Sequence, residues 1–177
     1  MKKLIFVFCF VFTLLSLFWR GKAVDKQLEI EEVNMLTGFG LETAKAVSAM
    51  HEYKIPASVI MAQAILESGW GTSKSARVFN AFFGWKAAGG WRGKTGVNAD
   101  GKCRAYDHAT ASYIDHAKSL RQYERYSDCF EVTALTKKAR AEKWAICLQD
   151  AGYCIDRKRY AKKLIKIINK YNLFQHD

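Results

Sequence analysis

Residues 62–71 read AQAILESGWG, an apolar run that ends in one acidic residue and a glycine-rich turn. The run follows Pro56, which suits the first position of a helix because no N–H is needed there. Apolar side chains then lie nearly all round the expected helix, which is typical of a helix at the centre of a domain. We expect Gly69 and Gly71 to end this helix. The segment therefore predicts the central helix of the fold, with Glu67 at its C-terminal end.

Glu67 is the strongest functional candidate in the chain. The helix dipole disfavours a carboxylate at a C-terminal end, so the position needs some compensation, and a function is one candidate. Burial beside the turn would raise the pKa of Glu67, as a general acid requires. Gln63 lies one helical turn earlier on the same face, where it is expected to orient the carboxylate or a substrate amide. The alternative is a helix-terminal glutamate that points into solvent.

The segments around the central helix predict a mostly helical α+β fold. Residues 85–106 differ from the rest, because five glycines lie among Trp85, Trp91 and other apolar residues, and residues 98–101 have turn chemistry. We expect a small two- or three-stranded lobe there, so that Glu67 lies between this lobe and a helical body. Apolar side chains at helical spacing predict the other helices: residues 41–53, 110–123, 136–151 and 157–173.

The first 23 residues are expected to lie outside the fold. Two lysines precede an almost unbroken apolar run, and residues 21–23 place small residues at the usual cleavage positions. This pattern is typical of a secretory signal peptide, which predicts export to the periplasm, the cell envelope or the exterior. The apolar run is short for a spanning helix, and an uncleaved membrane anchor is the alternative. Residues 24–39 then form a lead-in segment, and residues 40–177 form the domain.

The 177-residue chain carries a formal net charge of +11, which favours anionic polymers as partners. Nucleic acid is not expected, because the basic residues are spread over several helices and form no single recognition element. A solvated basic face is the alternative. We expect a monomer without cofactor or metal, since neither a phosphate-binding glycine loop nor a ligand-like cluster of histidines and cysteines is visible. Ser68 has no neighbouring base that would make it a nucleophile.

Four cysteines follow the apolar run, and in an exported chain they permit two disulfides with three possible pairings. Of these we expect Cys147 to pair with Cys154 and Cys103 with Cys129. Trp85 and Trp91, in the glycine-rich lobe, are predicted to form an exposed platform for sugar rings. Core packing is the alternative, and it must hold for some members of the aromatic set: Trp70, Phe79, Phe82, Phe83, Trp85, Trp91 and Tyr106.

Five blocks of the sequence stand in a fixed order: IPASV with AQAILESGWG (55–71), NAFFGWK (80–86), RAYD (104–107), the helix at 113–120, and AGYCID with YAKKL (151–164). Together they resemble the bacterial glucosaminidase domain of glycoside hydrolase family 73. This resemblance implies a lysozyme-like helical body with a small β-hairpin lobe beside a substrate groove. It also implies hydrolysis of the β-1,4 bond after N-acetylglucosamine in peptidoglycan, whose glycan strands would be the partner.

The resemblance also assigns roles to single residues. Glu67 matches the general acid of the family, and Tyr153 matches a tyrosine that lines the cleft and supports catalysis. Substrate-binding roles are expected for residues that match the groove or belong to the aromatic set: Gln63, Trp70, Asn80, Phe83, Trp85, Trp91 and Tyr106.

The short lobe departs from the pattern of the family. Many members carry a second acidic residue on a longer lobe, whereas the only carboxylate within residues 86–106 is Asp100, in a turn. Asp100 is therefore the third catalytic candidate, and Tyr153 together with the acetamido group of the substrate is the alternative for positioning water. The stereochemical outcome stays open. A lytic transglycosylase and a catalytically weak wall-binding module are the rival functions, although no Gly-Leu-Met-Gln-like segment follows Glu67.

Overall fold

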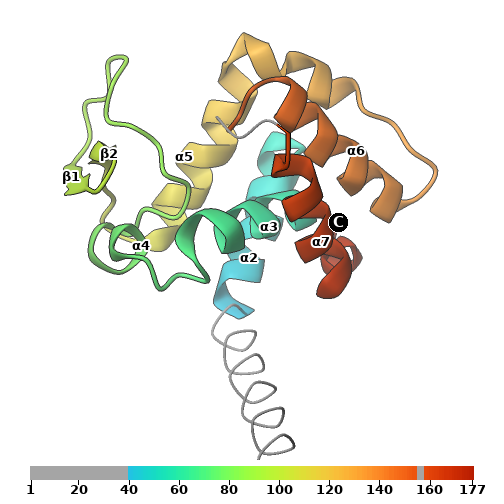
Figure 1. The fold of residues 1–177 in the computed structure, drawn as a ribbon, viewed down its shortest axis with the longest axis horizontal. Coiled ribbons are helices and arrows are strands. Elements are labelled where there is room, and N and C mark those ends of the chain that lie inside the picture. The colour runs from blue at the N-terminus through green and yellow to red at the C-terminus, as the bar shows by residue number, and fades with distance from the viewer. Residues whose placement is uncertain (1–39, 155–157) are drawn as a thin grey trace, which may run out of the picture. The chain divides into compact units, whose positions relative to one another are not determined.

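The computed structural model describes residues 40–154 and 158–177. The predicted signal peptide and lead-in segment, residues 1–39, lie outside the described residues. The described chain is mostly helical with one small antiparallel sheet, so the predicted α+β class is confirmed (Figure 1). Its elements are α2 (Gly40–Tyr53), α3 (Ala57–Ser68), α4 (Lys74–Phe79), β1 (Thr95–Asn98), β2 (Gly101–Arg104), α5 (Ala109–Gln122), the 3-10 helix η1 (Glu124–Glu131), α6 (Lys137–Asp150), α7 (Tyr160–Lys170) and the 3-10 helix η2 (Leu173–His176).

Helix α3 is the central helix, as its apolar sequence predicts. Every residue from Ala57 to Ile65 is buried, and α3 contacts α2, α6, α7 and η2. Pro56 stands at its N-cap position, and Gly69 ends it in the left-handed conformation with φ 56°. The helix thus runs through the core, and its last turn places Glu67 at the surface.

The turn after α3 is left-handed over three consecutive residues. Gly69, Trp70 and Gly71 have φ values of 56°, 61° and 75°, a region that costs a non-glycine residue such as Trp70 about 1–2 kcal/mol. Ser68 holds this turn, because its hydroxyl donates to the Ala64 carbonyl and accepts from the Gly71 N–H. Ser68 is therefore a buried structural residue.

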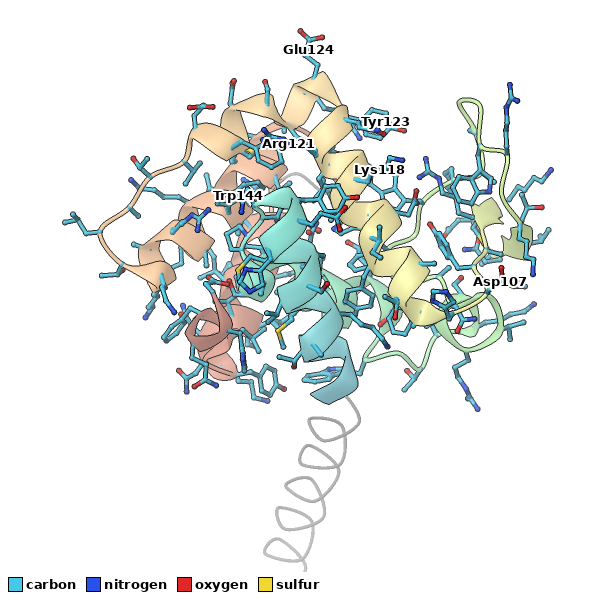
Figure 2. All side chains as sticks on the ribbon, turned by 180° about the vertical axis from the view of Figure 1, so that it is seen from behind. Asp107, Lys118, Arg121, Tyr123, Glu124 and Trp144 are labelled. Carbon is cyan, nitrogen blue, oxygen red and sulfur yellow. A yellow bond between two sulfur atoms is a disulfide. The ribbon has the colours of Figure 1, made fainter. Side chains whose placement is uncertain are left out.

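The β lobe is a two-stranded hairpin that lies beside α4 and α5 (Figure 1). The lobe packs closely on α4, because a Cβ added at Gly96 would lie 2.6 Å from the ring of Phe79. Arg104 fastens β2 to α5 through a 2.7 Å ion pair with Asp115. Figure 2 shows the molecule from behind, with Asp107 on the lobe side and Trp144 in the helical body. None of the described helices has the length and apolar character that crossing a bilayer requires.

The predicted disulfide pairing is wrong. Cys129 in η1 pairs with Cys147 in α6, whereas Cys103 and Cys154 are free thiols. The sequence did not predict η1 as a helical element, and it is η1 that brings Cys129 beside α6. Cys103 is buried in the lobe, and Cys154 lines the cleft described below.

Candidate active site

A cleft of about 920 Å³ lies between the end of α3 and the β lobe. The three residues predicted to be catalytic all line this cleft. Glu67 and Tyr153 come from the helical body, and Asp100 comes from the lobe. Two predicted substrate-binding residues, Phe83 and Trp85, also line it. The fold therefore brings these five residues, from four separate parts of the sequence, to one cavity.

The Glu67 carboxyl group is accessible to solvent in the cleft and is closely surrounded by protein. Burial raises its pKa, while a hydrogen bond from Tyr160 and the positive charge of Lys163 partly oppose this effect. The raised pKa agrees with the expectation from its place at a helix end. A carboxylic acid of this kind can keep its proton closer to neutral pH and deliver it to a bound group.

Tyr153 follows the end of α6 on a turn in which Gly152 has a φ of 73°. Its N–H donates to the Leu148 carbonyl, which holds the turn against α6. The Tyr153 hydroxyl oxygen is buried and has no hydrogen-bond partner among the described residues. Burial, followed by the nearby Tyr160 and Glu67, raises the pKa of Tyr153 well above its ordinary value, so the hydroxyl keeps its proton. The cleft thus contains a neutral donor close to the acid.

The turn that follows α4 supplies the aromatic wall. Phe83 is buried and stacks on the His116 ring at a centroid distance of 3.8 Å. Trp85 is half-buried, and its indole N–H donates to His116 Nδ1 over 3.1 Å. Trp85 stays partly exposed in the cleft, with the Arg104 guanidinium 5.3 Å from the centroid of its ring, whereas Phe83 mainly supports the wall.

Asp100 lies at the tip of the hairpin and is exposed. Its N–H donates to the Asn98 side chain, and its carbonyl accepts from Lys86. Glu67 and Asp100 are the two carboxylates among the described residues of the cleft, one from the body and one from the lobe.

Gln63 lies behind the cleft wall. It is fully buried, and its amide bonds to Tyr160 and His116. A side chain in this position has no surface to offer a substrate, so any influence on Glu67 must pass through Tyr160.

Three predicted substrate-binding residues do not line the cleft and instead support the lobe: Asn80, Trp91 and Tyr106. Asn80 ends α4 in the left-handed conformation and donates to the Tyr106 and Asp107 carbonyls over 3.1 and 3.2 Å. Tyr106 donates to Asp115 over 2.7 Å, and Trp91 lies over the Arg104 guanidinium at 4.7 Å. Trp91 therefore packs within the lobe, as the alternative interpretation of the aromatic set allows.

Trp70 lies at a second, smaller hollow of about 340 Å³ along α7. Its ring packs edge-to-face on Tyr171, with the centroids 4.9 Å apart. Three lysines of α7 line the same hollow: Lys163, Lys166 and Lys170.

Sequence reasoning missed Tyr160 and His116 as site residues. Both are fully or almost fully buried, and both bond to Gln63, with Tyr160 also among the groups that lower the pKa of Glu67. Tyr160 belongs to the apolar stripe of α7 and His116 to a helix beside the lobe, so helical periodicity alone classed them as packing residues. Their presence inside two of the resembling blocks was the signal that could have found them.

The profile of the family described as mannosyl-glycoprotein endo-beta-N-acetylglucosaminidase matches residues 43–173, which include the cleft residues named above. The chain belongs to the glucosaminidase family. It is therefore a glycoside hydrolase.

Sequence and structural similarity to known proteins supports this glucosaminidase assignment. The chain is 30% identical to the exo-glucosaminidase LytG of Bacillus subtilis over 198 residues, which cover 99% of this chain and 67% of LytG. It is 33% identical to the peptidoglycan hydrolase FlgJ of Escherichia coli K12 over 139 residues, 69% of this chain and 42% of FlgJ, so it spans less than half of FlgJ. The catalytic domain of the autolysin Auto from Listeria monocytogenes superposes with a TM-score of 0.65 at 30% identity, covering 81% of this chain and 87% of that domain.

Proposed function

We propose that this glucosaminidase cleaves the β-1,4 bond after N-acetylglucosamine in peptidoglycan, with Glu67 as the general acid. The observation that carries the proposal is a carboxyl group that lines the cleft beside the lobe and whose pKa is raised by burial. Glycoside hydrolysis needs an acid that protonates the leaving oxygen, and Glu67 has a raised pKa and access to the cleft. The similarity to the peptidoglycan hydrolase FlgJ and to the exo-glucosaminidase LytG supports the choice of substrate.

The aromatic wall supports a sugar-binding role for the cleft. Trp85 is partly exposed in the cleft, and sugar C–H groups pack on aromatic rings of this kind. A ring held there would lie in the same cleft as the Glu67 carboxyl group. In this arrangement Glu67 protonates the bridging oxygen while the sugar on the other side develops positive charge.

Tyr153 is our candidate for the group that positions water or the acetamido oxygen of the substrate. Its buried hydroxyl has no hydrogen-bond partner among the described residues, and such a group is unfavourable until a ligand atom bonds to it. Asp100 is the competing candidate, because it is the other carboxylate of the cleft. If Asp100 positions the water, Asp100→Asn should lose activity as completely as Glu67→Gln.

The test is digestion of purified sacculi by the wild type and by Glu67→Gln, with Glu131→Gln as the matched control on an exposed part of η1. We expect reducing N-acetylglucosamine ends from the wild type and the control, and none from Glu67→Gln. Anhydromuramic ends would support a lytic transglycosylase instead. Binding to sacculi without released ends would support a wall-binding module, and an active Glu67→Gln would refute the role of Glu67.

We also propose that the enzyme works in the cell envelope or outside the cell. The basic charge and the apolar N-terminal run support this location, since the substrate lies beyond the cytoplasmic membrane. Fractionation of cells that produce the full chain, followed by mass measurement of its N-terminus, tests both export and cleavage.

A further inference from the structure

The hollow beside Trp70 combines an apolar floor with a cationic rim. It has a volume of about 340 Å³ and is lined by the last turn of α3, by Trp70 and by one face of α7 with its C-cap. Two isoleucines, Leu66, Trp70 and Tyr171 form the apolar part of the lining. The rest of the lining is made of lysines, and no acidic side chain is present among its described residues: Lys163, Lys166 and Lys170. We call this cavity the lysine hollow.

The three lysines reach the hollow from one face of α7. They follow one another at intervals of three and four residues, the spacing that places side chains on the same face of a helix. Like charges at this spacing weaken a helix, and Lys163 stands in the first turn, where the helix dipole disfavours a cation. Helix formation therefore does not explain the arrangement, whereas a bound anion would be favoured by it.

Trp70 forms the floor of the hollow at a conformational cost. Its φ of 61° lies in the left-handed region, which glycine adopts far more readily than tryptophan. The Trp70 ring packs edge-to-face on Tyr171, and the Lys170 ammonium lies 4.9 Å from the centroid of the Tyr171 ring. Backbone strain of this kind concentrates at functional sites. The aromatic pair thus provides an apolar surface directly beside a positive charge.

The lysine hollow and the catalytic cleft lie on two sides of the same helical turn. Leu66 lines the hollow, and the next residue, Glu67, lines the cleft. Successive residues of a helix point about 100° apart, so the two cavities open in different directions from the end of α3. A polymer whose main chain lies at Glu67 can therefore place a side group in the hollow.

We propose that the lysine hollow binds the carboxylate-bearing peptides of the peptidoglycan strand whose glycan occupies the cleft. These short peptides branch from the glycan and combine small apolar side chains with carboxylate groups. The apolar groups match the floor of Trp70 and Tyr171, and the carboxylates match the lysine rim. This inference rests on the proposed function, because it names the part of the same substrate that the protein recognises beside the cleaved bond.

The charge of the hollow distinguishes the peptides from the sugars. Hydroxyl and acetamido groups are neutral, so a rim of ammonium groups offers them no charge complementarity. Peptides add carboxylates to the strand at regular intervals. We therefore expect the wild type to prefer strands that carry peptides to strands from which an amidase has removed them.

The first test measures binding without catalysis. The full chain, labelled with ¹⁵N, is titrated with the peptides that an amidase releases from sacculi, and the indole N–H signal of Trp70, assigned with Trp70→Phe, is followed by NMR. We expect this signal to move with peptide concentration while the signal of Trp91, in the lobe, stays in place. A Trp70 signal that does not move overturns the inference. Movement with phosphatidylglycerol vesicles but not with peptide overturns it in favour of a lipid site.

The second test removes charge from the rim. The double variant Lys166→Gln, Lys170→Gln should bind the peptides about fivefold more weakly, because exposed ion pairs each contribute modestly. Lys163 is kept, since its positive charge also lowers the pKa of Glu67. The matched control is Lys138→Gln, Lys162→Gln, which removes the same charge from exposed positions outside both cavities and should bind as the wild type does. Equal weakening in the two double variants would show that overall charge attracts the peptides, and would overturn the inference.

Enzymatic assays separate this inference from the proposed function. The ratio of kcat/KM for peptide-bearing strands to that for amidase-treated strands should fall about fivefold in Lys166→Gln, Lys170→Gln and stay unchanged in the control. If the wild type releases no glycan ends but the Trp70 signal moves with peptide, the proposed function fails and the peptide site stands. If the wild type is active and this ratio is the same in the rim variant, the lysine hollow does not recognise the peptides.

Discussion

The ring of Tyr153 stacks on the ring of Tyr160, with the centroids 5.3 Å apart and the planes inclined by 24°. Tyr153 follows α6 and Tyr160 begins α7, so the pair joins the two helices beside Glu67. Burial raises the pKa of both hydroxyls, and both therefore stay protonated as donors. The Tyr160 hydroxyl accepts a hydrogen bond from Gln63, whereas the Tyr153 hydroxyl has no partner among the described residues.

Tyr153→Phe should reduce kcat for peptidoglycan fragments by about 10²-fold or more, because the variant removes the hydroxyl donor that we propose acts on the water or the substrate. The ring stack on Tyr160 is retained, so Tm should change little. Tyr53→Phe at the end of α2 is the matched control and should keep full kcat. A fully active Tyr153→Phe would show that its hydroxyl has no catalytic task.

Glu67→Gln should raise the Tm at neutral pH, because it replaces a carboxyl group whose folded-state pKa is raised by burial. Such a group favours the folded state when protonated, and this contribution is lost as pH rises through the folded-state pKa. The stabilisation by Gln should therefore disappear below about pH 4, where Glu67 is protonated in both states. Thermal unfolding of both proteins between pH 3 and 8 measures this, and an equal difference at every pH would contradict it.

Reduction of the Cys129–Cys147 disulfide should lower the free energy of unfolding by about 3 kcal/mol, because the bond closes a loop with a sequence separation of 18. Urea denaturation with and without reducing agent measures the loss. The double variant Cys129→Ala, Cys147→Ala should be insensitive to the reducing agent. If reduction leaves the urea midpoint of the wild type unchanged, the disulfide does not stabilise the fold.

Asp177→Ala should lower the free energy of unfolding by about 1 kcal/mol, the usual contribution of a helix cap. The Asp177 carboxylate accepts from the Ser58 N–H and from the Ser58 hydroxyl, each over 2.8 Å, and so satisfies the first turn of α3. Gln175→Ala, at an exposed neighbouring position, should have a much smaller effect. If the two variants are equally stable in urea, Asp177 does not stabilise the fold as a cap of α3.

The local sequence could predict the fold class and the acid candidate. The apolar run of α3, Pro56 before it and Gly69 after it fix a buried helix that ends at Glu67, because helix periodicity and caps depend on residues close together in the chain. The glycine-rich stretch likewise predicted a small lobe. Phe83, Trp85 and Tyr153, which were expected at the groove, line the same cleft as Glu67.

The sequence could not predict which side chains meet across the core. Gln63 was expected at the groove, but packing of α7 and α5 against α3 buries it between Tyr160 and His116. Trp91 was expected in an exposed platform and Tyr106 at the groove, whereas Trp91 packs on Arg104 and Tyr106 bonds to Asp115, so both support the lobe.

The sequence by itself determined a central apolar helix that ends in a carboxylate and a left-handed turn, because these features follow from neighbouring residues. Only the tertiary structure decided that Cys129 meets Cys147 and that Gln63 is buried between Tyr160 and His116. Pairings of this kind join segments far apart in the chain, and their geometry exists only after the helices have packed. The same packing supplies the burial that raises the pKa of Glu67, which no stretch of sequence determines alone.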